Sequence, residues 1–413
     1  MLIPMTLNAH PGTAYGIPFP VLLRASFGTF GANIPAVMRG LVACGWFGIQ
    51  AWVGGAAIYG TAAIIFGFDP STKTILPVLG LSPGEFGCFL IFWAINVYFI
   101  VKGMESIKWL EVLSAPFLLL IGGVLMFWAY QAADGFGPIF SQPETLLASG
   151  KFWPVFGAGL TAMVGFWATL SLNIPDFSRF ARTQRDQVIG QAIGLPPTMA
   201  LYSFIGIVVT SATIVVFGEA IWDPVAVIAK FGSKTLSAAA LVTLAVATLS
   251  TNIAANIVSP ANDFSALAPR HISFRTGGII AAILGLIMMP WKLMADPSGY
   301  IFTWLIGYSA LLGPIAGIMI ADYFIVRQKH LNVAELYETH GAYRYRNGFS
   351  IVSLTTFVLA VLPSLPGFLA QVGALDPATT SAWLLAPYNY AWFVGFTLAF
   401  FVYLILRKLA PGT

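Results

Sequence analysis

The sequence predicts an all-α integral membrane protein with about ten transmembrane helices, and three observations support this fold class. First, 58% of the 413 residues are hydrophobic and only 9% are charged. Second, the mean hydropathy is +0.83, so a water-soluble fold would lack polar residues for its surface. Third, apolar runs that could cross ~30 Å of hydrocarbon recur along the chain. The charged residues fall almost wholly between these runs or at their ends.

Each apolar run is long enough to form a membrane-spanning helix, which needs roughly 20 residues. The segment 1–35 is different, because it is rich in Gly and Pro, and we expect it to be an interfacial or re-entrant connector. The expected spans are 36–66, 83–101, 109–132, 153–173, 189–217, 235–258, 276–290, 299–325, 349–372 and 385–406.

The Lys and Arg residues indicate the orientation, because cytoplasmic loops of membrane proteins carry an excess of them. When the expected helices are threaded alternately through a bilayer, all but five of the 20 Lys and Arg residues fall on one side, together with every arginine. We therefore expect a multi-pass protein of the cell (inner) membrane with both termini in the cytoplasm. The five lysines on the other side are Lys73, Lys151, Lys230, Lys234 and Lys292.

The ionisable residues argue against an enzyme, because catalytic membrane proteins usually carry such groups inside their spans. Asp176 and Asp322 fall at helix ends, and Asp176 with Arg179 is expected to be a solvated cytoplasmic helix end. No HExxH, GxSxG or phosphate-binding glycine loop occurs. The net charge of +4 follows from the orientation pattern and needs no nucleic-acid partner. The four histidines are expected in loops: His10, His271, His330 and His340.

One tryptophan and one glutamine stand out in the first expected span, within "CGWFGIQAW". Trp46 and Gln50 are four residues apart and share one helix face. They lie about ten residues beyond Arg39, which is near the membrane centre at ~1.5 Å per residue. The pair fits a binding wall made of an indole and an amide. It also fits a packing aromatic beside an interhelical hydrogen bond, and both interpretations stay open here.

A second cluster lies in the fourth expected span, where Gly165 and Phe166 precede Trp167. Glycine weakens a helix, and a helix broken at mid-membrane is tolerated where it lines a cavity. Trp167 would then face that cavity. An aromatic side chain packed against a neighbouring helix is an equally good interpretation of this segment.

The third cluster is polar and lies in "AVATLSTNIAANIVSP". Ala247, Ser250 and Thr251 share one helix face, so two hydroxyls and a carbonyl freed by local distortion could bind a monovalent cation such as sodium. Asn256 lies on a different face, ~7.5 Å further along the axis, where it could contact a substrate. Polar contacts between helices are the alternative interpretation for these residues.

Two indoles and two amides together describe a slot for a flat, neutral ring. Indoles stack on planar π-systems, and an amide offers both a donor and an acceptor. Nucleobases, hydantoins and ureides have these properties. Sugars, carboxylates and quaternary amines would need other side chains.

The chain resembles the nucleobase-cation symporter-1 family, which includes cytosine, uracil and allantoin permeases and a hydantoin transporter. The resemblance runs from about residue 9 to the C-terminus. It implies a leucine-transporter-like fold of two inverted five-helix repeats plus two further helices. The matching motifs are "HPGTAYGIPFPVLLRASFGTFGANIPA", "CGWFGIQAW", "NIPDFSRFAR", "LSTNIAANIVSPANDFSALAP", "ISFRTGGIIA", "MMPWKLM" and "LLGPIAGIMIADYFIVR".

The resemblance also implies a role for each residue that matches a family motif. Trp46 and Trp167 match the two stacking tryptophans. Asn252 is expected to hold the binding residues in place without contacting the substrate itself. The other matches implied for substrate are Gln50, Gly165, Phe166 and Asn256, and those implied for the cation are Ala247, Ser250 and Thr251.

The chain departs from the family in its number of helices, because family members have twelve. The ten expected here match the third to the twelfth, so we expect the first two helices to be missing and Met1 to be an internal methionine of a longer frame, or the chain to be a fragment. The expected division is an N-terminal segment 1–35, a transporter core 36–326, a cytoplasmic loop 327–348, and two C-terminal helices and a tail in 349–413.

The sequence therefore predicts a secondary transporter that imports a neutral nucleobase, heterocycle or ureide by sodium or proton symport. We expect it to work by alternating access as a monomer in lipid, with no other cofactor. The helix containing "YIFTWLIGYSALLG" could bend at Gly307 or Gly313 as a gate. The alternatives are a truncated, non-transporting paralogue and a passive channel for small neutral solutes, which would show neither saturation nor cation dependence.

Overall fold

The computed structural model describes residues 1–70, 75–102, 104–141 and 152–410, and the regular structure of this part is helical, without a β-strand. Lys73 and Lys151, which enter the orientation argument, lie outside the described residues. Seven helical stretches are long and apolar enough to cross a membrane, and three shorter apolar helices lie in the other expected spans. The all-α prediction is therefore confirmed.

The expected spans correspond one by one to single helices or to two or three consecutive helices. Several are interrupted, and short helices connect them. In chain order the spans are α3 (Asn33–Phe66), α4 (Pro83–Lys102), α5 (Met104–Ala132), α8 (Phe152–Phe166) with α9 (Ala168–Asn173), α11 (Gln184–Phe217), α13 (Lys234–Asn256) with α14 (Val258–Leu267), α15 (Phe274–Ile287), η1 (Gly299–Leu305) with α17 (Ile306–Ile320) and η2 (Ala321–Val326), α19 (Ile351–Val361) with α20 (Leu365–Gln371), and α22 (Ala391–Leu409).

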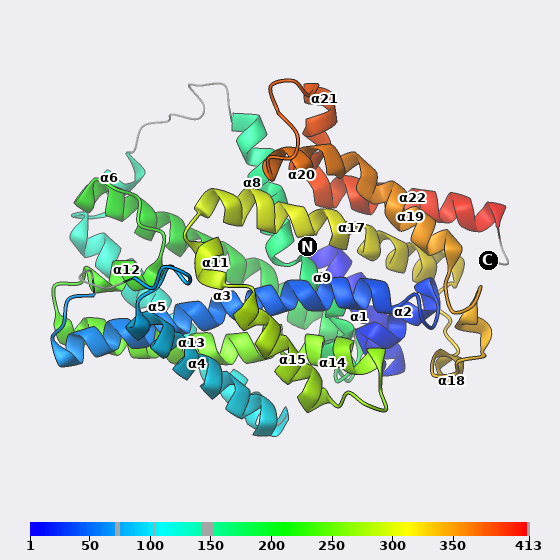
Figure 1. Ribbon diagram of the computed structural model, residues 1–413, viewed down its shortest axis with the longest axis horizontal. Coiled ribbons are helices and arrows are strands. Elements are labelled where there is room, and N and C mark those ends of the chain that lie inside the picture. Colours follow the sequence, from blue (N-terminus) through cyan, green and yellow to red (C-terminus); the bar gives the residue numbers. More distant parts are fainter. Residues whose placement is uncertain (71–74, 103, 142–151, 411–413) are drawn as a thin grey trace.

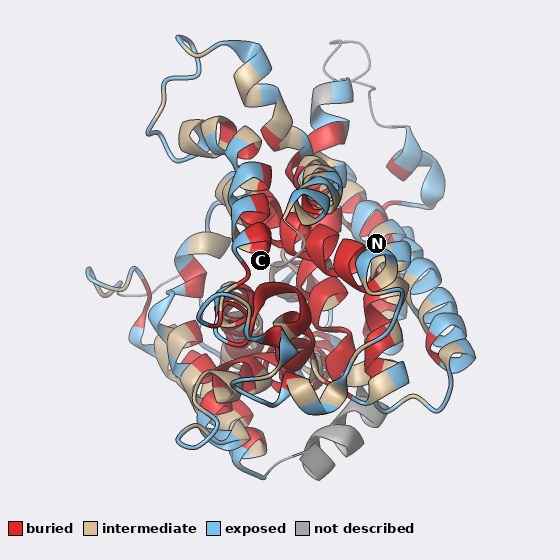
Figure 2. Ribbon diagram, turned by 90° about the vertical axis from the view of Figure 1, so that its right-hand side faces the viewer, coloured by how far each residue is buried: buried red, intermediate tan, exposed pale blue. Residues whose placement is uncertain are grey.

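Helices α3 and α17 form the centre of the molecule and are the most enclosed of the spans (Figure 1). Helix α3 packs against α13, α4 and α15, whereas α17 packs against α22 and α19. The view along the helices shows buried residues gathered in the middle and exposed faces outside (Figure 2). Many exposed residues on α5, α11 and α22 are large and apolar, as expected of a surface that meets lipid.

The interruption between α13 and α14 has a cause in the sequence. Pro260 has no N–H to donate to the carbonyl of Asn256, and its ring crowds the preceding turn. Helix α13 accordingly ends at Asn256, and Ile257 has φ −115° and ψ −46°. The interruption between α8 and α9 falls at Trp167, two residues after Gly165.

The N-terminal segment is more regular and more buried than an interfacial connector. It forms α1 (Leu2–Tyr15) and α2 (Phe19–Phe27), and α1 packs against α10 (Pro175–Ser178) and α11. His10 is consequently in a helix, where its Nδ1 lies 2.9 Å from the hydroxyl of Tyr323. The prediction that His10 is in a loop was wrong, because Pro11 lies within the helix without ending it.

Candidate functional site

The candidate site begins at the contact between α3, α8 and α17. Trp46 on α3 is 7% exposed, and its indole N–H donates to the hydroxyl of Tyr308 at 3.3 Å. Tyr308, on α17, donates in turn to the carbonyl oxygen of Gly165 at 2.9 Å. The ring of Trp46 meets Phe166 edge to face at 5.0 Å. Two residues that are far apart in sequence, Trp46 and Phe166, are thus brought together.

The end of α8 lies so close to α17 that only glycine fits at position 165. A Cβ added to Gly165 would lie 2.7 Å from the carbonyl oxygen of Leu305. Next to it, Phe166 is 39% exposed and Trp167 occupies the gap between α8 and α9. The rings of Phe166 and Trp167 meet at 5.8 Å, and the Trp167 N–H points to the sulfur of Met199 on α11 at 2.8 Å.

Gln50 presents an acceptor that has no donor. It lies one turn beyond Trp46 on α3, and its Oε1 is buried without a hydrogen-bond partner. Buried carbonyl oxygens in native proteins are nearly always bonded. An unpaired amide oxygen on the same helix face as Trp46 is therefore suited to a ligand that carries an N–H donor.

A chain of amides leads to Asn256 at the end of α13. Its Nδ2 donates to Oδ1 of Asn252 at 3.0 Å, and Asn252 donates to Oδ1 of Asn96 at 3.2 Å. Asn96 on α4 is fully buried and donates to the carbonyl of Phe92 at 2.8 Å. Sequence reasoning did not select Asn96, although an asparagine within "IFWAINVYFI" was a visible signal.

The expected cation residues lie in an unbroken part of α13. Ala247 and Ser250 are buried, and the hydroxyl of Thr251 donates to the Ala247 carbonyl at 3.0 Å. The local distortion expected here is not seen, since α13 continues to Asn256. It occurs instead at Ile257, because the residue four positions after Asn256 is Pro260.

Buried charges lie beyond the aromatic cluster, near the end of α9. Asp176 is 1% exposed and accepts a hydrogen bond from the N–H of Phe19 at 2.9 Å. The expectation that Asp176 is solvated was wrong, because α2 folds over it. Burial raises the pKa of this carboxyl. Arg39 and Asp263 form an ion pair at 3.2 Å with both side chains fully buried.

Comparisons with known proteins place these residues in a family. The profile of the permease family for cytosine/purines, uracil, thiamine and allantoin matches residues 1–395. A purine-uracil permease of Arabidopsis thaliana is 43% identical over 99% of this chain and 68% of its own length. An allantoin permease of Bacillus subtilis is 43% identical over 98% and 81%. A hydantoin permease of Microbacterium maritypicum is 33% identical over 85% and 69%.

The fold also matches a solved transporter. The structure of Mhp1, a nucleobase-cation-symport-1 family transporter, in a closed conformation with bromovinylhydantoin bound, has a TM-score of 0.77 and 27% identity. The match covers 99% of this chain and 83% of that one. An inward-facing conformation of the same transporter has a TM-score of 0.75. The expected transporter fold is therefore confirmed.

Proposed function

Because the chain belongs to the family of permeases for cytosine/purines, uracil, thiamine and allantoin, we propose that it imports a neutral nucleobase or a related heterocycle or ureide by cation symport. As a family member it is a multi-pass membrane transporter. The relatives named above are permeases for purine and uracil, allantoin and hydantoin. Uracil, allantoin and hydantoin each contain a flat ring with N–H groups next to C=O groups, which are the groups that an amide can recognise.

The unpaired oxygen of Gln50 is the observation that carries this proposal. An acceptor buried without a donor costs free energy that a bound N–H group would recover. Phe166 contacts both Trp46 and Trp167, so the three side chains form one aromatic group that can contact a flat ring. The proposed substrate-binding residues are Trp46, Gln50, Gly165, Phe166, Trp167 and Asn256.

Neighbouring asparagines fix the orientation of the Asn256 amide, which favours a specific hydrogen bond to a substrate. Asn252 and Asn96 fix its rotamer through two hydrogen bonds in series. A preoriented amide loses little side-chain entropy when a substrate binds. We therefore assign Asn252 and Asn96 a positioning role.

The coupling cation is proposed to bind at Ala247, Ser250 and Thr251. The Thr251 hydroxyl uses its proton on the Ala247 carbonyl, so its lone pairs remain available to a cation. Uncharged oxygen ligands suit sodium, and a proton is the other candidate ion. The cation-symport name of the solved family member supports coupling to a cation but leaves the ion to be determined.

The remaining parts of the proposal concern the whole chain. The core 36–326 would carry both sites, 327–348 would be a cytoplasmic loop, and 349–413 would add two helices outside the core. We place the protein in the inner membrane as a monomer surrounded by lipid, with both termini and the 1–35 segment on the cytoplasmic side. No catalysis is proposed, and recovery of chemically unchanged substrate after uptake would test this.

Uptake into proteoliposomes tests the function directly. Labelled uracil, allantoin and hydantoin would be compared with and without a sodium or a proton gradient, and unlabelled rings would compete. We expect saturable uptake of one ring that depends on one gradient. Uptake that neither saturates nor responds to either gradient would indicate a channel, and no uptake above empty liposomes would contradict the proposal.

The variant Trp167→Ala tests the stacking contact. Loss of one aromatic stack is expected to weaken substrate binding by about tenfold. The matched control is Trp153→Ala, because Trp153 is 69% exposed at the start of α8, the helix that Trp167 follows. Equal affinities in the two variants would rule out a stacking role for Trp167.

A further inference from the structure

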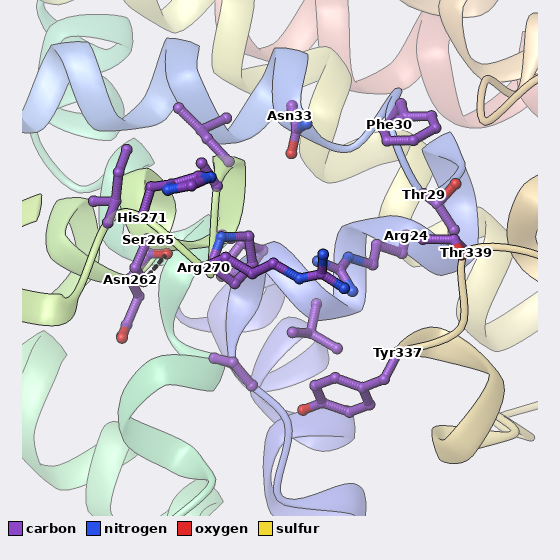
Figure 3. A pocket seen from close by; sticks show the side chains of 18 of the residues that line it. Arg24, Thr29, Phe30, Asn33, Asn262, Ser265, Arg270, His271, Tyr337 and Thr339 are labelled. Atoms are coloured by element: carbon purple, nitrogen blue, oxygen red, sulfur yellow. Dashed lines mark hydrogen bonds between the residues drawn. The ribbon is translucent and has the colours of Figure 1, made fainter.

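A cavity lies apart from the proposed substrate site. It has a volume of about 910 Å³, and none of the proposed substrate or cation residues lines it. Three segments form its walls: α2 with its connection to α3, the connection between α14 and α15, and residues 337–339 after α18 (Val333–Leu336) (Figure 3). The cavity is too large for a single ion and has room for an organic molecule.

Two arginines from opposite walls extend toward each other across this cavity (Figure 3). Arg24 comes from α2, and Arg270 comes from the α14–α15 connection. Arg24 donates to the carbonyl of Leu336 at 2.9 Å, but neither arginine forms an ion pair with a described residue. Burial lowers the pKa of Arg24. Two facing cations repel each other unless an anion lies between them.

The neighbouring polar groups are also donors. The side-chain nitrogen of Asn262 is buried and has no acceptor. His271 and the hydroxyl-bearing Tyr337 line the same cavity. Glu338 is the one acidic residue of the lining, and it is exposed and unpaired among the described residues. The cavity therefore has an excess of donors and positive charge.

We propose that this cavity binds a phosphate-bearing ligand between Arg24 and Arg270. A phosphate offers several acceptor oxygens, which match the planar hydrogen-bond donors of the two guanidinium groups. A single carboxylate has only two oxygens and would leave part of this donor set unused. The surplus volume holds the organic body to which the phosphate is attached.

The ligand would connect two parts of the transporter. It would tie α2 to the connection between α14 and α15. The first residue of α2, Phe19, bonds through its N–H to Asp176, which follows the broken helix that carries Trp167. A bound phosphate should therefore stabilise the fold against heat, because only the folded chain brings the two arginines together.

Both arginines lie on the side that the charge pattern assigns to the cytoplasm. Two sources of the ligand are present there, the headgroups of anionic lipids and soluble organic phosphates. The chemistry of the site is the same for both, so the experiment must separate them. The lipid source rests on the proposed orientation, whereas the phosphate site itself does not.

The test measures thermal unfolding of the purified full chain. Inorganic phosphate is titrated against chloride at equal ionic strength, and separately the protein is placed in bilayers of phosphatidylglycerol or phosphatidylcholine. The variant Arg270→Gln removes one guanidinium while leaving the Arg24 bond to Leu336. Arg24→Gln with Arg270→Gln removes both. The matched control is Arg182→Gln, an exposed arginine outside the cavity.

We expect ligand-dependent stabilisation of the wild type and of Arg182→Gln. Arg270→Gln should weaken the apparent affinity by about tenfold, because a charge-assisted bond is lost. A response to both inorganic phosphate and phosphatidylglycerol supports a site open to soluble phosphates. A response to phosphatidylglycerol alone supports a headgroup site. The proposal is overturned if neither inorganic phosphate nor phosphatidylglycerol stabilises the protein, or if Arg270→Gln responds as Arg182→Gln does. Uptake assays do not enter this test, so its failure would leave the proposed transport function untouched.

Discussion

At the scale of single residues, we predict that a substitution of Gln50 changes substrate binding but not the stability of the fold. Its Oε1 makes no hydrogen bond in the structure, so replacing it should cost the fold little. The variant Gln50→Leu is expected to keep or slightly raise the unfolding temperature and to raise KM about tenfold or more. Thermal melts and uptake kinetics on the same preparation measure both. A fall in stability with unchanged KM would mean that Gln50 has only a structural role.

Asp176 gives a prediction about pH. Burial raises its pKa, so the folded protein holds the proton to higher pH than the unfolded chain does. The resulting stabilisation is complete below the unfolded pKa of about 4 and is lost as pH rises through the folded pKa. Asp176→Asn keeps an acceptor for the N–H of Phe19 but cannot ionise, so we expect its unfolding temperature to depend less on pH. Parallel pH curves for both proteins would contradict this.

Some features of the candidate site could be predicted from the sequence and others could not. The sequence places Trp46 and Gln50 on one helix face because helical spacing is local, and their contact with a substrate stays a prediction. Asn96, Arg39 and Asp263 were missed, because their burial depends on partners that lie far away along the chain. Asp176 was misjudged for the same reason, since α2 covers it. A single sequence shows spacing on one helix but not which helices meet.

At the scale of helices, two of the glycines of α17 have different surroundings. A Cβ on Gly313 would lie 2.6 Å from the backbone carbonyl of Trp392 in α22, whereas one on Gly307 would meet the movable ring of Phe368 at 3.1 Å. Gly313→Ala should therefore force α17 and α22 apart and destabilise the protein by roughly 1–3 kcal/mol. The packing thus assigns Gly313 to the contact with α22 and leaves Gly307 as the better candidate for a bend.

The variant Gly307→Ala tests that bend. Alanine favours the helix by about 1 kcal/mol over glycine, so the variant should be at least as stable as the wild type and should transport several-fold more slowly. Gly313→Ala is the comparison, because its defect should appear first in the melting temperature. Wild-type uptake by a stable Gly307→Ala protein would show that gating does not use this position.

The positions of the membrane-spanning helices were predicted well, because each is encoded by a continuous apolar run and because few structures other than a helix can cross a bilayer. The interruptions were harder to place. The break expected beside Gly165 falls two residues later, at Trp167. The distortion expected near Ala247 and Thr251 falls instead at Ile257, before Pro260. The π-helical stretches η1 and η2 leave no pattern in the apolar runs.

At the scale of the whole molecule, the distribution of arginines predicts an orientation that labelling can test. Single cysteines would be introduced after Cys44 and Cys88 are replaced by alanine. Arg185→Cys lies in the connection expected inside the cell, and Ser381→Cys lies in the connection expected outside, and both positions are exposed. A membrane-impermeant maleimide added to intact cells should label position 381 and leave position 185 unlabelled until the membrane is opened.

The reverse labelling pattern would show that the protein has the opposite orientation. The phosphate cavity would then lie at the outer surface, where it could not meet the cytoplasmic leaflet. Labelling at both positions in intact cells would require an even number of spans between them, and would therefore contradict the assignment of the helices from α11 to α20.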